Sequence, residues 1–356
     1  TRVNYDILSY LPEDIETMKG QDILLDEFGT GAFSVAVIDG MQEKEISQLE
    51  DKLKEIDHVK DVLWYGALAD ISIPMDMLPD DLKDSLQNAD TGSQLMIITF
   101  DTSKSADETL DAVEEIRGLT NEQCLLSGMS AVVTDIKKIC NSEVIMYVVI
   151  AAGLSALVLA LTMDSFLLPF IFLLSIGMAI VYNLGTNFIA GEISFVTQAL
   201  AAVLQLAVTM DYSIFLWHSY LENQERYPDD RKRAMSHAIS QTLTSVVGSS
   251  ITTIAGFLAM CFMSFTLGMD LGIVMAKGVV FGVIGCVTIL PAMILAMDKW
   301  IEKTRHKAII PDLGRIGGFV TKHYWIFIIL FLVIIGPAFY GQNHNQVYYD
   351  LVGTLP

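Results

Sequence analysis

Six long apolar stretches constrain the fold of this chain more than any other feature of its sequence. A hydrocarbon core about 30 Å thick is crossed by about 20 apolar residues in an α-helix, because each residue advances the helix by about 1.5 Å. The stretches long enough for this are residues 144–162, 166–182, 193–217, 242–264, 272–297 and 324–340. The sequence therefore predicts a membrane α-helical bundle with six transmembrane helices.

The connections between these stretches differ in charge, which predicts their sidedness. Residues 222–241 carry four Lys or Arg and residues 298–323 carry six, whereas the connections 183–192, 265–271 and 341–356 carry none. The two kinds of connection alternate along the chain, as antiparallel spans require. Because basic loops stay on the cytoplasmic side, we expect 222–241 and 298–323 to be cytoplasmic in a multi-pass protein of a bacterial plasma membrane.

Acidic charge is concentrated before the first span. Residues 1–143 hold 30 Asp or Glu against 11 Lys or Arg, while residues 144–356 hold 12 against 11. The first segment therefore reads as an acidic soluble domain, and the predicted sidedness places it outside the cytoplasm. A surface of this charge argues against nucleic acid as a partner, because phosphate binding needs basic side chains. We expect its scattered carboxylates to form a solvated face rather than a site.

The soluble segment alternates between two periodicities. A period of two residues predicts strands at 33–39, 59–65, 94–101 and 124–127, and a helical period predicts helices at 43–56 and 106–119. The order βαββαβ predicts an α+β ferredoxin-like extracytoplasmic porter domain, with an insertion at 74–86.

The four cysteines show no spacing typical of a metal site. Cys261 and Cys286 lie in apolar stretches and are expected to pack as small side chains. Cys124 and Cys140 could pair if their domain faces an oxidising space, and the sequence leaves this open.

A short internal repeat predicts a larger parent protein. Residues 3–12, VNYDILSYLP, recur as residues 347–356, VYYDLVGTLP, with five of ten positions identical. The second copy directly follows the last span. We therefore expect a span before residue 1 and a second soluble domain after residue 356, in a protein of two parallel repeats. The expected divisions are a porter-like domain at 1–143, a five-helix bundle at 144–300, a cytoplasmic linker at 301–323, a further span at 324–340 and the start of a second porter-like domain at 341–356.

Asp211 is the candidate functional residue, because it lies well inside a predicted span. A carboxylate near the bilayer centre costs about 2.5–3.5 kcal/mol on insertion scales. Apolar surroundings oppose its charged form, so the group could bind and release a proton. The adjacent Tyr212 could donate its hydroxyl to the carboxylate. The alternative is a structural Asp bonded to a neighbouring helix. His218 is interpreted as an interfacial residue, and Lys277 as a side chain that snorkels to the headgroups.

Two polar stripes accompany Asp211. Ser249, Thr252, Thr253 and their neighbours Ser245 and Gly256 give the 242–264 helix a small, polar face, which suits close packing and could also line a proton relay. Gln198, Gln205, Thr209 and Tyr212 form a second stripe on the Asp211 helix. We expect the two helices that carry these stripes to face each other within the bundle.

The segment Ala207–Leu216, AVTMDYSIFL, followed by a charged loop, resembles the fourth span of MMPL-type transporters of the RND superfamily. The segments SITTIAGFL at 250–258, LGMDLG at 267–272 and LPA at 290–292 are similar to the fifth and sixth spans. The resemblance implies that the chain holds spans two to seven of twelve, and that Asp211 and Tyr212 relay protons with Ser249, Thr252 and Thr253 lining the path. It extends to sterol-sensing-domain proteins. Lys277 departs from the family pattern.

The resemblance implies a proton-motive-force-driven exporter of lipids or other amphiphilic molecules, with no enzymatic activity and no cofactor. Its expected partners are membrane lipids or an amphiphilic substrate, protons and the second half of the transporter, in a monomer or a homo-oligomer. One alternative is a lipid- or sterol-sensing protein without transport, whose ligand binding would survive Asp211→Asn. Another is a Sec-type translocation accessory, against which the sequence Tyr212-Ser-Ile-Phe weighs.

Overall fold

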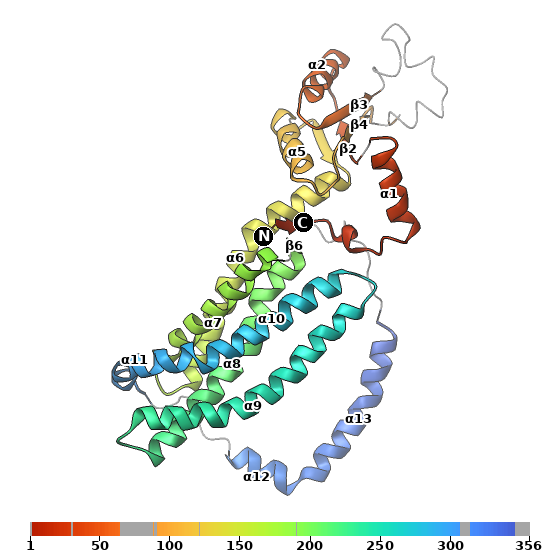
Figure 1. Cartoon of the computed structure of the whole chain (residues 1–356). Helices are drawn as coiled ribbons and strands as arrows, with labels where there is room; N and C mark the ends of the chain where they lie inside the picture. The colour runs from red at the N-terminus through yellow and green to blue at the C-terminus, as the bar shows by residue number, and fades with distance from the viewer. Residues whose placement is uncertain are drawn as a thin grey trace.

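The computed structural model describes residues 2–29, 31–64, 88, 91–120, 122–189, 191–306 and 314–345. A mixed α/β part stands at one end of a long helical bundle (Figure 1). The 74–86 insertion and most of the 341–356 segment lie outside the described residues. The expected division of the chain at these points therefore stays a prediction.

The α/β part contains a four-stranded sheet built from β2 (Ala32–Ile38), β3 (Val59–Trp64), β4 (Gln94–Phe100) and β5 (Cys124–Ser127). Its strand order is β3-β4-β2-β5, and all three neighbouring pairs are antiparallel. Helix α2 (Glu43–Lys54) connects β2 to β3, and helix α5 (Asp107–Leu119) connects β4 to β5. The predicted strands and helices are therefore present, with bounds that shift by at most two residues.

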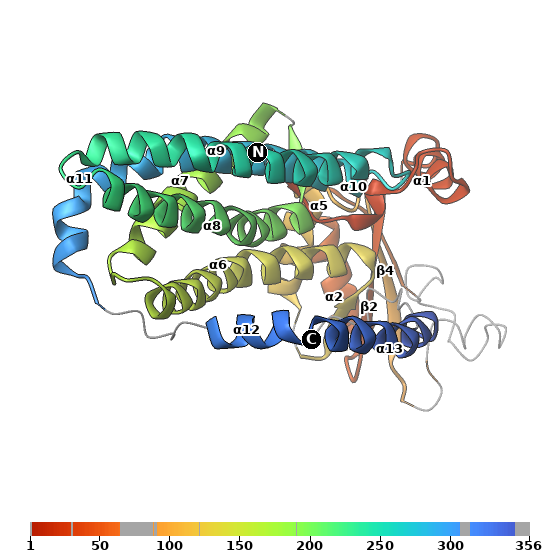
Figure 2. The ribbon, with the colours of Figure 1, turned by 90° about the horizontal axis from the view of Figure 1, so that it is seen from below.

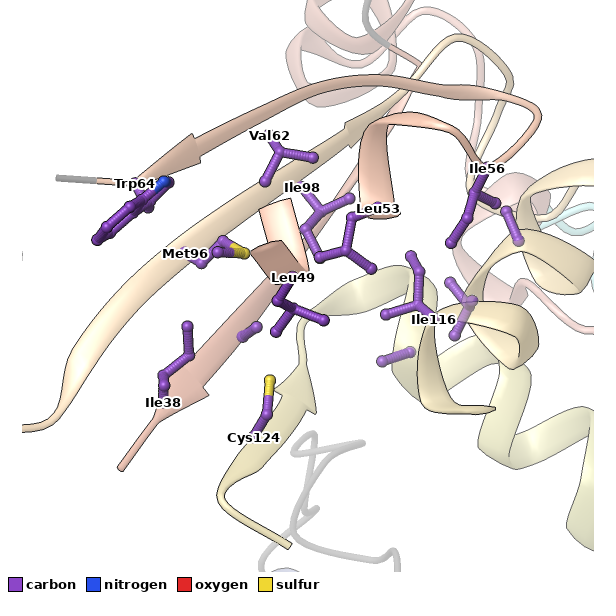
Figure 3. Packing of buried hydrophobic residues seen from close by; sticks show 14 of the residues in the cluster. Ile38, Leu49, Leu53, Ile56, Val62, Trp64, Met96, Ile98, Ile116 and Cys124 are labelled. Carbon is purple, nitrogen blue, oxygen red and sulfur yellow. The ribbon is translucent and has the colours of Figure 1, made fainter. Parts of the chain in front are cut away.

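Alternation along the strands decides which sheet face is covered. On β2 the even-numbered residues, such as Ala36 and Ile38, are buried against α2 and α5. Figure 3 shows this core, where Leu53 of α2 and Ile116 of α5 meet Ile98 of β4. The odd-numbered side chains point to the opposite face, which exposes large apolar groups: Phe33, Leu63, Ile97 and Leu125.

The bundle is built from α6 (Met129–Thr162), α7 (Leu168–Gly185), α8 (Phe195–Arg226), α9 (Arg231–Ala259), α10 (Leu267–Val287) and α11 (Ile289–Lys303), followed by α12 (Gly314–Lys322) and α13 (Tyr324–Asn343). Among the described residues, six helices are long and apolar enough to cross a membrane, with Leu267–Lys303 as one span. The length and apolar composition of these six helices confirm the prediction of six candidate spans.

The helices extend beyond the apolar stretches that predicted them. The 222–241 connection is mostly helical, because α8 continues to Arg226 and α9 already begins at Arg231. Pro228 has no N–H for a continuing helix, and the Asp230 carboxylate caps α9 by accepting from the backbone N–H of Arg233 at 2.9 Å. The basic residues therefore lie on helix ends rather than in a long loop.

Helix α6 runs without interruption from the sheet into the bundle (Figure 1). At its start, Ser130 and Ala131 are buried beside β2, where the Ser130 hydroxyl donates to the Phe33 carbonyl at 3.2 Å. Helix α13, in contrast, is set apart from the bundle in both views (Figures 1 and 2), and every one of its residues is exposed.

Candidate functional site in the membrane-spanning bundle

Asp211 lies on the exposed side of α8, in the middle of the candidate span Phe195–Arg226. Within the part of the chain that the structure describes, its carboxylate makes no hydrogen bond and no ion pair. Within the described chain, Asp211 is therefore not bonded to a neighbouring helix of this bundle.

Tyr212 points into the protein instead. Its side chain is 3% exposed and belongs to the apolar cluster between α7, α8 and α10, together with Phe172 and Cys286. Successive helix positions diverge by about 100°, so adjacent residues cannot share one face. No hydrogen bond joins the Tyr212 hydroxyl to Asp211 in the described chain. The expected donation is therefore absent from this conformation.

The register between α8 and α9 brings Ser249 to the height of Asp211. Where these antiparallel helices cross, Gln241 Oε1 of α9 accepts from the Asn223 amide at 2.8 Å and from the Ser219 hydroxyl at 3.1 Å. Asp211 lies eight residues before Ser219, and Ser249 lies eight residues after Gln241. Both therefore stand about 12 Å from the Ser219–Gln241 hydrogen bond, measured along the helices.

The predicted lining residues follow Ser249 along α9. Ser249 and Thr252 are exposed and Thr253 is half-buried. The hydroxyls of Thr252 and Thr253 donate to the Ser249 carbonyl at 2.7 and 3.1 Å, so both are anchored to their own helix while their oxygens keep accepting capacity.

Asp211 of α8 and the exposed Ser245, Ser249 and Thr252 of α9 together form an uncovered polar surface. In a bilayer such a surface cannot face hydrocarbon, because an uncompensated carboxylate or hydroxyl there costs free energy. This surface must therefore contact protein or water.

The second predicted stripe turns away from α9. Gln205 and Thr209 are buried, and the amide of Asn183 on α7 donates to Gln205 Oε1 at 2.9 Å. Gly278 and Gly282 of α10 lie directly against these side chains. Helices α8 and α9 pack against each other, as expected. The side chains of Gln205 and Thr209, however, face the glycines of α10 rather than the polar face of α9.

Lys277 is half-buried, and its ammonium group donates to Asn187 Oδ1 in the connection between α7 and α8. This buried amide oxygen satisfies one ammonium proton. His218 is exposed at the other end of α8, as expected for an interfacial residue.

Asp270 fastens the N-terminal end of α8 to α10, and the sequence analysis missed it. Its carboxylate accepts from the Ser194 backbone N–H at 2.8 Å and from the Thr197 hydroxyl at 2.7 Å. Four residues before Asp270, Thr266 binds the N-terminal segment. Its backbone N–H and its hydroxyl both donate to the Tyr10 carbonyl at 2.9 Å.

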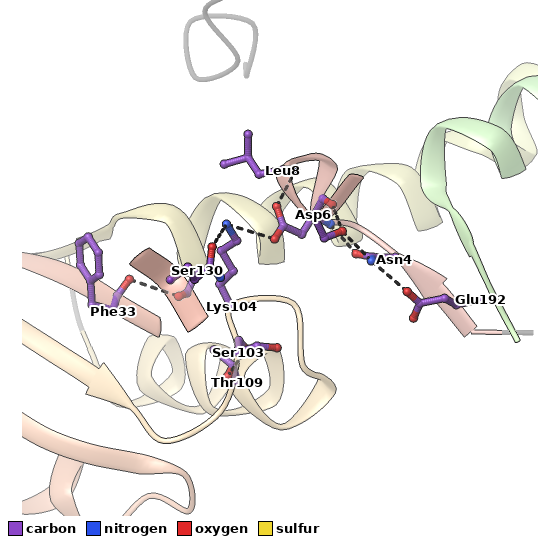
Figure 4. Close-up of polar contacts among 11 residues, drawn as sticks. Asn4, Asp6, Leu8, Phe33, Ser103, Lys104, Thr109, Ser130 and Glu192 are labelled. Atoms are coloured by element: carbon purple, nitrogen blue, oxygen red, sulfur yellow. Dashed lines mark hydrogen bonds and ion pairs between the residues drawn. The ribbon is translucent and has the colours of Figure 1, made fainter. Parts of the chain in front are cut away.

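A second polar network joins the N-terminal segment to the α/β part (Figure 4). β1 (Arg2–Asn4) pairs in parallel with β6 (Glu192–Ser194). The Asn4 amide donates to Glu192 Oε1 at 3.3 Å, and the buried Asp6 pairs with Lys104 at 3.3 Å. These contacts tie the sheet domain to the same end of the bundle as Asp270.

Asp164 plays a comparable part at the opposite end and was also missed. It accepts from the buried Trp217 indole at 3.0 Å and from Arg305 Nε at 2.9 Å. Nearby, Arg231 pairs with Asp298 and, at 3.1 Å, with Glu302. A lone Asp in a short turn gives no sequence signal for such partners, because they lie 53 and 141 residues away.

Comparison with known proteins agrees with this architecture. The profile of the MMPL family matches residues 23–325. The membrane protein SCO5905 of Streptomyces coelicolor is 26% identical over 295 residues, which cover 77% of this chain and 35% of that protein. The "Probable transport protein MmpL12" of Mycobacterium tuberculosis is 25% identical over 251 residues, which cover 66% of this chain and 22% of that protein.

Among solved structures, a SecDF crystal structure in a super-membrane-facing form aligns with a TM-score of 0.41 and 14% identity, over 85% of this chain and 40% of that chain. The chain spans about a third or less of the curated relatives described above. With a family profile matched over most of its length and six helices fit to cross a membrane, this chain is a member of the MMPL family.

Proposed function

We propose that this chain is part of a proton-driven transporter that exports lipids or other amphiphilic molecules. The observation that carries the proposal is the position of Asp211, a carboxylate in the middle of a span, exposed and unpaired within the described chain, at the height of the Ser249 hydroxyl. Membership of the MMPL family, and a relative described as a transport protein, support transport as the activity.

In this proposal Asp211 alternates between a charged and a neutral form. The charged form is tolerated when water or a donor reaches it, and the neutral form is favoured when the surface closes. One proton crossing a potential of 100 mV releases about 2.3 kcal/mol. Protonation of one carboxylate within a span is therefore on the scale needed to bias two packing arrangements of a bundle.

The polar surface formed by Asp211 of α8 and by Ser245, Ser249 and Thr252 of α9 is uncovered in the described chain. We propose that a second bundle of the same transporter covers it, as the repeat of residues 3–12 at 347–356 suggests. Homo-oligomers of the complete transporter are compatible with this arrangement. No bond-making chemistry and no cofactor enter the proposal.

The α/β part is proposed to be a ferredoxin-like porter domain outside the cytoplasm. Two interleaved βαβ units with the strand order β3-β4-β2-β5 support the assignment. The basic ends of α8, α9 and α11 lie at the other end of the bundle, which supports a cytoplasmic side there and a plasma-membrane location.

Asp211→Asn tests the proposal in the complete transporter. The experiment is proton-gradient-driven movement of a fluorescent amphiphile in membrane vesicles. The amide should abolish transport, because it keeps the shape of the side chain and removes its titration. Asp211→Glu, which still titrates, should retain part of the rate.

Unchanged transport by Asp211→Asn would refute the proposed function. Transport absent from the wild type, with amphiphile binding equal in the wild type and in Asp211→Asn, would instead indicate a sensing protein.

A further inference from the structure

We infer that a cavity between α8 and α9, at the end of the bundle with the basic helix ends, is a water-filled passage for protons to and from Asp211, with His218 and Glu222 as relay groups. The inference rests on the proposed proton coupling. It adds the route that connects a carboxylate in the middle of a span to bulk water.

The first support is the arrangement along α8. Asp211, Phe215, His218 and Glu222 follow one another at steps of four, three and four residues, and all four are exposed. Such steps keep side chains on one face of a helix. The face extends about 16 Å from Asp211 to Glu222. Two titratable groups therefore continue the line of Asp211 toward the helix end.

The second support is the cavity itself, which has a volume of about 340 Å³. Its lining residues come from both helices: Phe215, His218, Ser219 and Glu222 of α8, and Gln241, Thr242 and Ser245 of α9. Six of these seven side chains are polar. Since one water molecule occupies about 30 Å³ in the liquid, the cavity has room for a continuous group of waters.

The third support is an orphaned hydroxyl. Thr242 is 4% exposed, lines the cavity, and its Oγ1 has no hydrogen-bond partner in the described part of the chain. A buried polar group without a partner is unfavourable, because it loses its hydrogen bonds to water and gains none in the protein. A water molecule in the adjoining cavity would satisfy it, which is the usual solution for such groups.

Serines of α9 provide the remaining step past the apolar Phe215. The register set by Ser219 and Gln241 brings Ser245 to the height of Phe215 and Ser249 to the height of Asp211. A serine hydroxyl can donate one hydrogen bond and accept others. Ser245 and Ser249 can therefore hold waters between the cavity and the carboxylate.

His218 and Glu222 are the charged or titratable groups that line the cavity; the α9 side chains facing them, Gln241, Thr242 and Ser245, are neutral. An imidazole and a carboxylate can each accept and donate a proton. The two side chains can therefore pass protons along the cavity.

Thiol accessibility tests the water in the cavity without any transport assay. Ser245→Cys in the complete protein, in inside-out vesicles, is treated with a membrane-impermeant maleimide. The matched control is Val247→Cys, two residues along α9 on another side of the helix and 37% exposed. Labelling above the background of the native cysteines should be at least ten-fold faster for Ser245→Cys. Equal labelling of the two variants would overturn the inference.

The relay is tested by the double variant His218→Gln and Glu222→Gln. Its transport rate should fall about ten-fold, and the pH dependence of the remaining rate should flatten. Glu225→Gln, an exposed residue of the same helix outside the cavity lining, should keep the wild-type rate and profile. An unchanged pH profile in the double variant would refute the relay.

The two proposals fail in different ways. If Asp211→Asn stops transport while the double variant behaves as wild type, the relay is refuted and the proposed function is supported. If Asp211→Asn has no effect on transport, both the proposed function and the relay are refuted. The thiol experiment decides in either case whether the cavity contains water.

Discussion

Gly282 of α10 lies directly against Thr209 of α8, so that a Cβ atom at Gly282 would stand 2.1 Å from Thr209 Cγ2. The two helices approach this closely because one of them has no side chain at the contact. The buried Thr209 hydroxyl, which donates to the Gln205 carbonyl at 2.7 Å, holds its methyl group toward α10.

Gly282→Ala should therefore destabilise the bundle by about 1–3 kcal/mol, the usual cost of overpacking a core. Thermal unfolding of the purified protein in detergent measures it. Gly285→Ala is the matched control, since its Cβ would meet Ala179 Cβ at an ordinary 3.7 Å. Equal melting temperatures for both variants would contradict the close contact.

Asp270→Ala should loosen the end of the bundle nearest the sheet. The substitution removes a carboxylate that accepts two hydrogen bonds and leaves the buried Ser194 and Thr197 donors unsatisfied. Hydrogen bonds to a charged group contribute about 1.5–3 kcal/mol each. Amide hydrogen exchange should accelerate in β6 and the first turn of α8. The exposed Asp111 of α5 provides the control Asp111→Ala, which should leave both segments protected.

Asp164→Ala should destabilise the opposite end by about 1–3 kcal/mol, because the Trp217 indole N–H loses its acceptor while the ring stays 3% exposed. Tryptophan fluorescence and thermal unfolding measure the change. Asp229→Ala, at an exposed position between α8 and α9, should have no comparable effect. A normal Trp217 environment in Asp164→Ala would disprove the interaction.

Cys124 should resist alkylation in the folded protein. Its side chain is 4% exposed at the start of β5, and burial raises the pKa of its thiol. The neutral thiol is favoured in the folded state, so this contribution to stability is complete below about pH 8.5, the ordinary thiol value, and declines as the pH rises above it. Iodoacetamide at pH 8 should modify Cys124 much more slowly in the folded protein than in the protein unfolded by urea.

Both Cys124 and Cys140 are free thiols, so non-reducing and reducing electrophoresis should give the same mobility.

The sequence predicted the elements of this fold well, because each depends on local periodicity. Twenty apolar residues require a span, and alternation along residues 32–38 requires a half-buried strand. The α8 stripe shows the limit of this reasoning. Gln205 and Thr209 are recognisably one face of a helix, but whether that face meets α9 or α10 depends on Gly278 and Gly282, more than 70 residues away.

Some residues of the candidate site could be predicted from the sequence and others could not. Asp211 is evident because a carboxylate in an apolar stretch is costly wherever its helix packs. The opposite orientations of Asp211 and Tyr212 follow from the helix period, yet the sequence alone does not tell which of the two faces inward. Asp270 and Asp164 carried no signal, because an acidic residue beside a helix end is common and its distant partners become visible only in the folded chain.

Helix α6 has 34 residues and joins the sheet to the far end of the bundle without a break. At 1.5 Å per residue it is a rod about 50 Å long. Because one end is packed beside β2, a tilt of about 10° at the other end corresponds to a displacement of about 9 Å at the sheet. A small change in the tilt of α6 within the membrane part therefore produces a large displacement of the α/β part.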